Sequence, residues 1–125
     1  MNLSASSLLH LKKAVLPVLF FGLYLILGLS VYTDYGISFD EHWGRENGII
    51  NAKYIVQQLA PPSFNGEALC AGCPNLKDYQ DADHGPVFEI GTTFLEYILK
   101  IEDPGAIYKL RHLCSFLLFF LGSIF

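Results

Sequence analysis

Residues 113–125 read LCSFLLFFLGSIF, an apolar run whose most polar members are two serines and a glycine. A helix needs about 20 mostly apolar residues to cross the hydrocarbon core of a bilayer. This run would supply most of that length, and it keeps bulky side chains to its last residue. We therefore expect residues 109–125 to begin a transmembrane helix, and we expect the chain to be the N-terminal part of a larger polytopic membrane protein.

A second uncharged apolar run covers residues 14–32 and is close to the length of one membrane span. A cleaved signal peptide is the alternative, because Lys12 and Lys13 would suit its charged start. The run is longer than the apolar core of most signal peptides, and no cleavage site with small residues follows it. We therefore expect an uncleaved helix that keeps residues 1–13 in the cytoplasm and places residues 33–108 outside.

The composition of the chain agrees with a membrane protein. Hydrophobic residues make up 52% and charged residues 16%, and the mean hydropathy is +0.37. The acidic residues all lie between the two apolar runs, and a net charge of −4 without a basic patch argues against nucleic-acid binding. The sequence thus predicts an all-α, multi-pass protein with two transmembrane helices and an external loop. The membrane would be the plasma (inner) membrane of a bacterium or the endoplasmic reticulum of a eukaryote.

The loop between the two apolar runs is expected to hold two amphipathic helices, at about residues 40–59 and 86–100. Apolar residues recur at helical spacing in both segments. Pro61 and Pro62 end the first helix, and Pro86 suits the first position of the second. We expect both helices to lie at the membrane interface; the alternative is that they pack against each other outside the membrane.

An acidic motif comes directly after the first apolar run, where residues 34–42 read DYGISFDEH. Adjacent carboxylates at the mouth of a membrane cavity, here Asp40 and Glu41, can act as a general base or bind a divalent cation. His42 adds a further metal ligand or proton carrier. The alternative is a plain helix N-terminus, which favours acidic residues through the helix dipole.

Two further groups would suit a phosphate. His84 precedes a predicted helix N-terminus, where backbone N–H groups attract anions, although a simple Gly85-Pro86 turn explains the same residues. Lys109 and Arg111 precede the second apolar run and would bind a phosphate. The alternative for this pair is a membrane anchor whose charges reach toward the lipid headgroups.

Cys70 and Cys73 form a single Cys-x-x-Cys motif. One such motif is half of a zinc ribbon, and no second half follows. In an exported loop the pair predicts a local disulfide, with unmodified thiols or a redox or metal module as the alternatives. We expect Cys114 to be a buried small residue of the second span.

Taken together, the chain resembles the start of a GT-C membrane glycosyltransferase of the dolichyl-phosphate-mannose–protein mannosyltransferase-like group, glycosyltransferase family 39. The motifs that carry the resemblance are Asp34-x-Gly36-Ile37-Ser38-x-Asp40-Glu41, His84-Gly85-Pro86 and Arg111-His112-Leu113. The resemblance implies transfer of a sugar from a polyprenyl-phosphate donor in the membrane lipid to an acceptor on the non-cytoplasmic side. It implies that Asp40 is the base or the metal-facing acid, and that Glu41 is its neighbour.

The family resemblance leaves the donor sugar and the acceptor open, since a protein, a lipid or a glycan would each serve as acceptor. His84, Lys109 and Arg111 would contact the donor phosphate, and a divalent metal held by Asp40 and His42 is the one cofactor that the pattern allows. We expect this stretch alone to be inactive. The alternative function is a non-enzymatic two-span membrane protein whose acidic external loop binds a partner.

Overall fold

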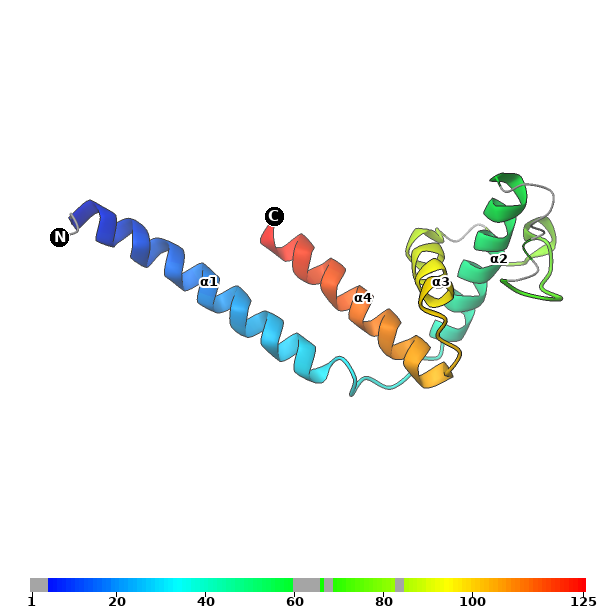
Figure 1. Ribbon diagram of the computed structural model, residues 1–125, viewed down its shortest axis with the longest axis horizontal. Helices are drawn as coiled ribbons and strands as arrows, with labels where there is room; N and C mark the ends of the chain where they lie inside the picture. Colours follow the sequence, from blue (N-terminus) through cyan, green and yellow to red (C-terminus); the bar gives the residue numbers. More distant parts are fainter. Residues whose placement is uncertain (1–4, 60–65, 67–68, 83–84) are drawn as a thin grey trace. The chain divides into compact units, whose positions relative to one another are not determined.

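A computed structural model of the chain describes residues 5–59, 66, 69–82 and 85–125 (Figure 1). Within this part, the elements are four α-helices and one short 3-10 helix, with no β-strand, so the predicted all-α class is confirmed. In chain order they are α1 (Ala5–Val31), α2 (Glu41–Leu59), η1 (Leu76–Asp78), α3 (Val87–Leu99) and α4 (Pro104–Ile124). They form two compact units, Met1–Tyr35 with His112–Phe125, and Gly36–Arg111, and we describe each unit separately.

The first unit pairs α1 with the second half of α4 through aromatic rings. The ring of Phe21 meets that of Phe120 with centroids 6.2 Å apart, and Tyr24 meets Phe116 at 5.9 Å. A side chain at Gly28 would overlap the ring of Phe116, so glycine permits this close approach. Because earlier residues of α1 meet later residues of α4, the two segments run antiparallel.

One described helix, α4, is long and apolar enough to cross a membrane. Only 17% of its apolar window is buried, unlike a helix in the core of a soluble protein, which is mostly buried. The described apolar part of α1, Val15–Val31, is shorter, so the second of the two predicted transmembrane helices stays a prediction. Helix α4 begins at Pro104, as the capping residue Asp103 and the proline after it predict from the sequence. The carboxylate of Asp103 accepts the N–H of Ala106 at 2.7 Å and caps the helix, so the helix begins five residues before the expected start of the span at residue 109.

In the second unit, α2 packs closely on α3, and two glycines of α2 permit the contact. A Cβ atom at Gly48 would lie 2.5 Å from the carbonyl oxygen of Glu89, and one at Gly44 would lie 3.1 Å from Oε1 of Glu89. Glycine lowers helix propensity, which is a local cost of this sequence. The packing explains why the helix contains glycine at both positions, four residues apart on one face.

Helix α3 buries its polar face and exposes much of its apolar face, the reverse of an amphipathic helix on the surface of a soluble protein. Its polar residues Thr92, Thr93 and Glu96 are buried. Most of its apolar residues are exposed, including Val87 at 84% and Ile98 at 69%, while Phe88, Ile90 and Phe94 are half-buried. The helix therefore presents an apolar surface outward while a polar cluster fills the contact between helices of this unit.

Candidate functional site

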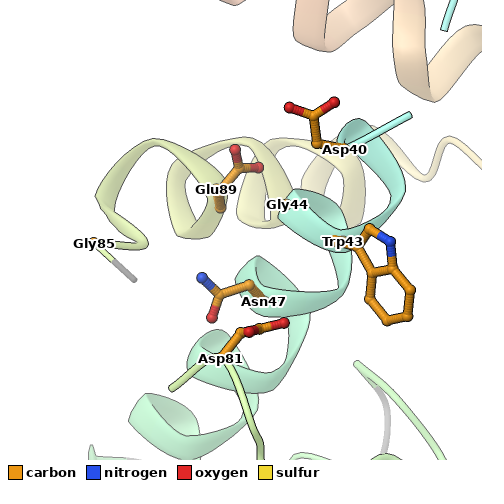
Figure 2. A pocket seen from close by; sticks show the side chains of 7 residues that line it. All are labelled: Asp40, Trp43, Gly44, Asn47, Asp81, Gly85 and Glu89. Carbon is orange, nitrogen blue, oxygen red and sulfur yellow. The ribbon is translucent and has the colours of Figure 1, made fainter. Parts of the chain in front are cut away.

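An open cleft of about 470 Å³ lies in the second unit (Figure 2). Three carboxylates from three different segments line it: Asp40 directly before α2, Asp81 in the connection between η1 and α3, and Glu89 in the first turn of α3. The other lining residues are Trp43, Gly44, Asn47 and Gly85. The cleft thus combines acidic groups, an amide and an exposed aromatic ring.

Asp40 is the predicted site residue that the fold places in this cleft. Its carbonyl oxygen accepts the N–H of Gly44 at 2.9 Å, so Asp40 is the residue from which α2 starts. Its side chain is exposed, and among the described residues no hydrogen bond or ion pair engages its carboxylate. Figure 2 shows the carboxylate projecting from the start of α2 at the top of the cleft. The positive end of the helix dipole stabilises a negative charge at this point.

The neighbours of Asp40 do not join it in the cleft. Glu41 and His42 are absent from the lining residues, because successive residues of a helix point to different sides. The ring of His42 instead lies edge-on to the ring of Trp43, with centroids 5.7 Å apart. Among the described residues no group of three His, Cys, Asp or Glu side chains is placed to hold a metal ion. The Asp40–His42 metal site that the sequence suggested stays a prediction.

Behind the cleft, four charged side chains from three helices form an ion-pair network that sequence reasoning missed. Glu96 of α3 accepts from Arg45 of α2, with Nε–Oε2 and Nη2–Oε2 distances of 3.0 Å, and its Oε1 lies 3.4 Å from Nη1 of Arg111 in α4. Arg111 also pairs with Glu89 through Nη2 and Oε2. The two arginines and two glutamates balance in charge, which lets them share the space between the helices.

Arg111 is one of the most deeply buried charged groups of the network. Its side chain is 4% exposed, Nη1 donates to the hydroxyl of Thr92 at 2.7 Å, and the guanidinium lies 5.9 Å from the ring centre of Phe88. A membrane anchor would reach toward solvent or headgroups, and Arg111 does not. A direct phosphate contact would require the arginine to give up a glutamate. The geometry therefore favours a role in holding Glu89 and Glu96.

The other predicted phosphate contacts are not gathered at the cleft. The side chain of Lys109 is exposed on α4 and does not line the cleft, and His84 lies outside the described residues. The residues that sequence reasoning missed at the site are Glu89, Asn47 and Asp81. A signal was present for Glu89, since Glu89, Thr92, Thr93 and Glu96 recur at i, i+3, i+4 and i+7 and form a polar stripe on an otherwise apolar helix.

The surroundings of Tyr79, two residues before the cleft residue Asp81, are electrostatically negative. Burial raises the pKa of Tyr79, and the nearby carboxylates of Glu46 and Asp81 raise it further. The hydroxyl of Tyr79 is shielded from solvent and has no hydrogen-bond partner among the described residues. A neutral or positively charged group is favoured near Tyr79 over an anionic one.

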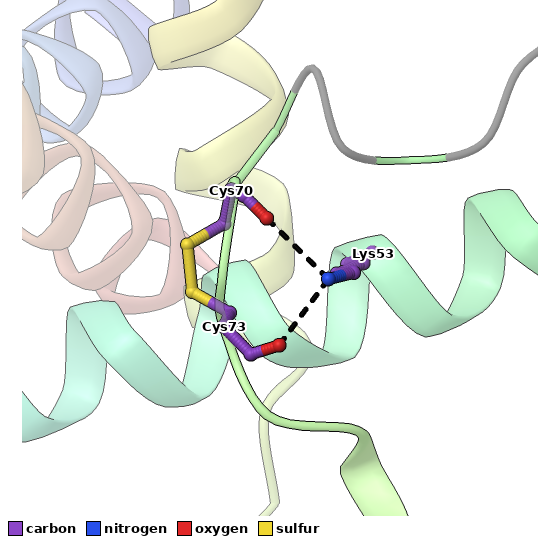
Figure 3. The surroundings of a disulfide bond; sticks show 3 residues. All are labelled: Lys53, Cys70 and Cys73. Carbon is purple, nitrogen blue, oxygen red and sulfur yellow. Dashed lines mark hydrogen bonds between the residues drawn. A yellow bond between two sulfur atoms is a disulfide. The ribbon is translucent and has the colours of Figure 1, made fainter.

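The cysteine pair forms a separate, structural feature (Figure 3). Cys70 and Cys73 are joined by a disulfide with Cα atoms 5.7 Å apart. Nζ of the buried Lys53 lies 3.2 Å from the carbonyl oxygen of Cys73 and 3.4 Å from that of Cys70. The turn that the disulfide closes thus supplies backbone acceptors to a buried ammonium group of α2.

Comparison of the chain with protein-family models, with curated proteins and with solved structures finds no match. A functional proposal for the chain therefore depends on the motifs of its sequence and on the geometry of the cleft.

Proposed function

We propose that this chain belongs to an integral membrane glycosyltransferase of the GT-C type, which transfers a sugar from a polyprenyl-phosphate donor to an acceptor on the non-cytoplasmic side. The observation that carries the proposal is the position of Asp40. Of the adjacent acids in the motif, Asp40 alone lines the cleft, and its carboxylate is exposed there without a partner among the described residues. A general base needs both access to its substrate and an unengaged carboxylate.

The chemistry assigned to the cleft is a proton abstraction coupled to a substitution. The Asp40 carboxylate accepts the proton of an acceptor hydroxyl, whose oxygen forms a bond to the anomeric carbon of the sugar. The bond between that carbon and the phosphate oxygen breaks, and the polyprenyl phosphate leaves with the electron pair. Trp43 at the edge of the cleft offers an aromatic face to the sugar ring, and Asn47 offers an amide.

Placement at a membrane is the second part of the proposal. A lipid-linked donor is delivered within the bilayer, so the site that uses it belongs at the membrane surface. The apolar length of α4, and the outward apolar face of α3 shortly before it in the chain, support that location. We assign residues 14–32 to a further span and residues 33–108 to the non-cytoplasmic side, where the Cys70–Cys73 disulfide would be stable.

The test is an Asp40→Asn substitution in the complete gene product that contains this chain, assayed in membranes with radiolabelled polyprenyl-phosphate sugars. Loss of a general base lowers a rate by roughly 10²- to 10⁴-fold, and we expect a loss in this range. Glu41→Gln is the matched control, because Glu41 adjoins Asp40 but does not line the cleft. Transfer at the wild-type rate in Asp40→Asn would refute the assigned role. Absence of transfer in the wild type would favour the non-enzymatic, partner-binding alternative.

A further inference from the structure

We propose that Glu89 is a second functional carboxylate of the cleft, which binds a hydroxyl group of a pyranose while Arg111 fixes its position. The inference rests on the proposed function for its biological meaning. It assigns to Glu89 the binding of the sugar, and it leaves the proton transfer to Asp40.

The two oxygens of the Glu89 carboxylate have different surroundings. Oε2 pairs with the guanidinium of Arg111, on the side of the ion-pair network. Oε1 lies against α2 at Gly44, where a Cβ atom would be 3.1 Å away, so glycine permits the oxygen to lie there, and both residues line the cleft. Figure 2 shows Glu89 on α3 and Asp40 at the start of α2, on the two helices that border the cleft. A carboxylate oxygen accepts more than one hydrogen bond, so Oε1 has capacity for a ligand hydroxyl.

Arg111 holds this carboxylate rigidly because it is itself fixed by other groups. Its Nη1 is engaged by Thr92 and Glu96, and the ring of Phe88 lies over the guanidinium. A carboxylate attached to a fixed cation loses little freedom when a ligand binds. A binding site is precise when neighbouring groups fix the side chains that contact the ligand, as Arg111 fixes Glu89.

The two glutamates that pair with Arg111 differ in solvent exposure, which distinguishes Glu89 from a residue with a purely structural role. Glu96 also pairs with Arg111, and its side chain is 6% exposed, as expected for a counter-ion that serves the packing. Glu89 is 23% exposed and lines the cleft, although the same arginine binds it. The two glutamates lie seven residues apart on the same helix and share a partner, so each is a control for the other.

The experiment compares Glu89→Gln with Glu96→Gln in the complete gene product, by measuring kcat and KM for the polyprenyl-phosphate sugar. A hydrogen bond to a charged group contributes enough for a roughly 10- to 100-fold rise of KM when the charge is removed. We expect that rise for Glu89→Gln, with a smaller change of kcat. For Glu96→Gln we expect a lower melting temperature and a KM within about threefold of the wild type. Equal KM values for the wild type and Glu89→Gln, or equal rises in both variants, would overturn the inference.

A binding measurement separates this inference from the proposed function. Trp43 is the only tryptophan of the chain and lines the cleft, so its fluorescence reports binding there. The chain in detergent is titrated with the methyl pyranosides of mannose, glucose and galactose. A saturable response that Glu89→Gln weakens at least tenfold and Glu96→Gln retains supports the role of Glu89, even if no transfer activity is found. No response to any of the three sugars in the wild type would refute it.

Discussion

The role of Arg111 depends on the two glutamates that pair with it in the folded chain. The sequence offers Arg111 as a basic residue at the head of an apolar run, and that position suits a phosphate contact or a membrane anchor. In the folded chain the guanidinium is buried, and Glu89 and Glu96 neutralise it. The residue therefore connects the packing of α3 and α4 with the position of a carboxylate in the cleft.

Removal of Arg111 is expected to destabilise the second unit strongly. An Arg111→Met substitution leaves Glu89 without its cation and Glu96 with Arg45 alone, and the loss of one member of a buried pair costs about 3–5 kcal/mol. The free energy of unfolding, measured by denaturant titration in detergent, checks the value. Lys109→Met is the control, because Lys109 is exposed on the same helix and its loss should change the stability by no more than about 0.5 kcal/mol. Equal effects of the two substitutions would contradict the network.

Tyr79 gives a prediction about alkaline pH. The pKa of Tyr79 is raised in the folded chain above its ordinary value of 10.0, because of burial first and of Glu46 and Asp81 second. A raised folded-state pKa means that the stabilising contribution is fully present below pH 10 and is lost as the pH rises through the folded pKa. We therefore expect the stability of the wild type to fall relative to that of Tyr79→Phe above pH 10. Denaturant unfolding of both proteins from pH 8 to pH 11.5 tests this, and a constant difference across the range would exclude it.

At the scale of elements, the packing of α2 on α3 depends on an approach that only glycine permits. A Cβ at Gly48 meets the backbone of Glu89, which cannot move aside as a flexible side chain would. The same backbone contact holds the first turn of α3 at the edge of the cleft. The position of Glu89 is therefore set by α2 as well as by Arg111.

The prediction at this scale compares two glycine-to-alanine substitutions. Gly48→Ala should destabilise the unit by about 1–3 kcal/mol through overpacking, although alanine is the better helix former. Gly91→Ala in α3 should stabilise it by roughly 0.5–1 kcal/mol, because a Cβ there meets nothing within 4 Å. The melting temperatures of both variants show whether overpacking between the helices or helix propensity dominates at each position. A stabilising effect of Gly48→Ala would show that the helices are farther apart than described.

For the whole molecule, the disulfide reports on which side of the membrane the loop lies. The turn from Cys70 to Cys73 is oxidised, and a disulfide persists in an oxidising compartment. The proposed topology therefore predicts that an impermeant maleimide labels these cysteines in intact cells only after mild reduction. The measurement uses a Cys114→Ser background, so that any labelling comes from the pair. Labelling without reduction would contradict the placement of the loop on the non-cytoplasmic side.

The sequence alone determined the helical content of the chain and where most of the helices lie. The predicted segments 40–59 and 86–100 correspond to α2 at Glu41–Leu59 and α3 at Val87–Leu99. The Asp103-Pro104 step marks the start of α4. These features depend on apolar periodicity, proline and capping groups within a few residues of one another, and such local signals are readable in the order of residues.

Only the tertiary structure decided which charged groups meet and which acids share a cleft. Arg45 and Glu96 are 51 positions apart, and the sequence around neither residue indicates that the two side chains form an ion pair. Periodicity identified the apolar face of α3, but its polar face is buried because Arg45 and Arg111 compensate Glu96 there. The energy of a buried charge depends on partners that other helices bring to it, so the site emerges from the packing of helices rather than from any one segment.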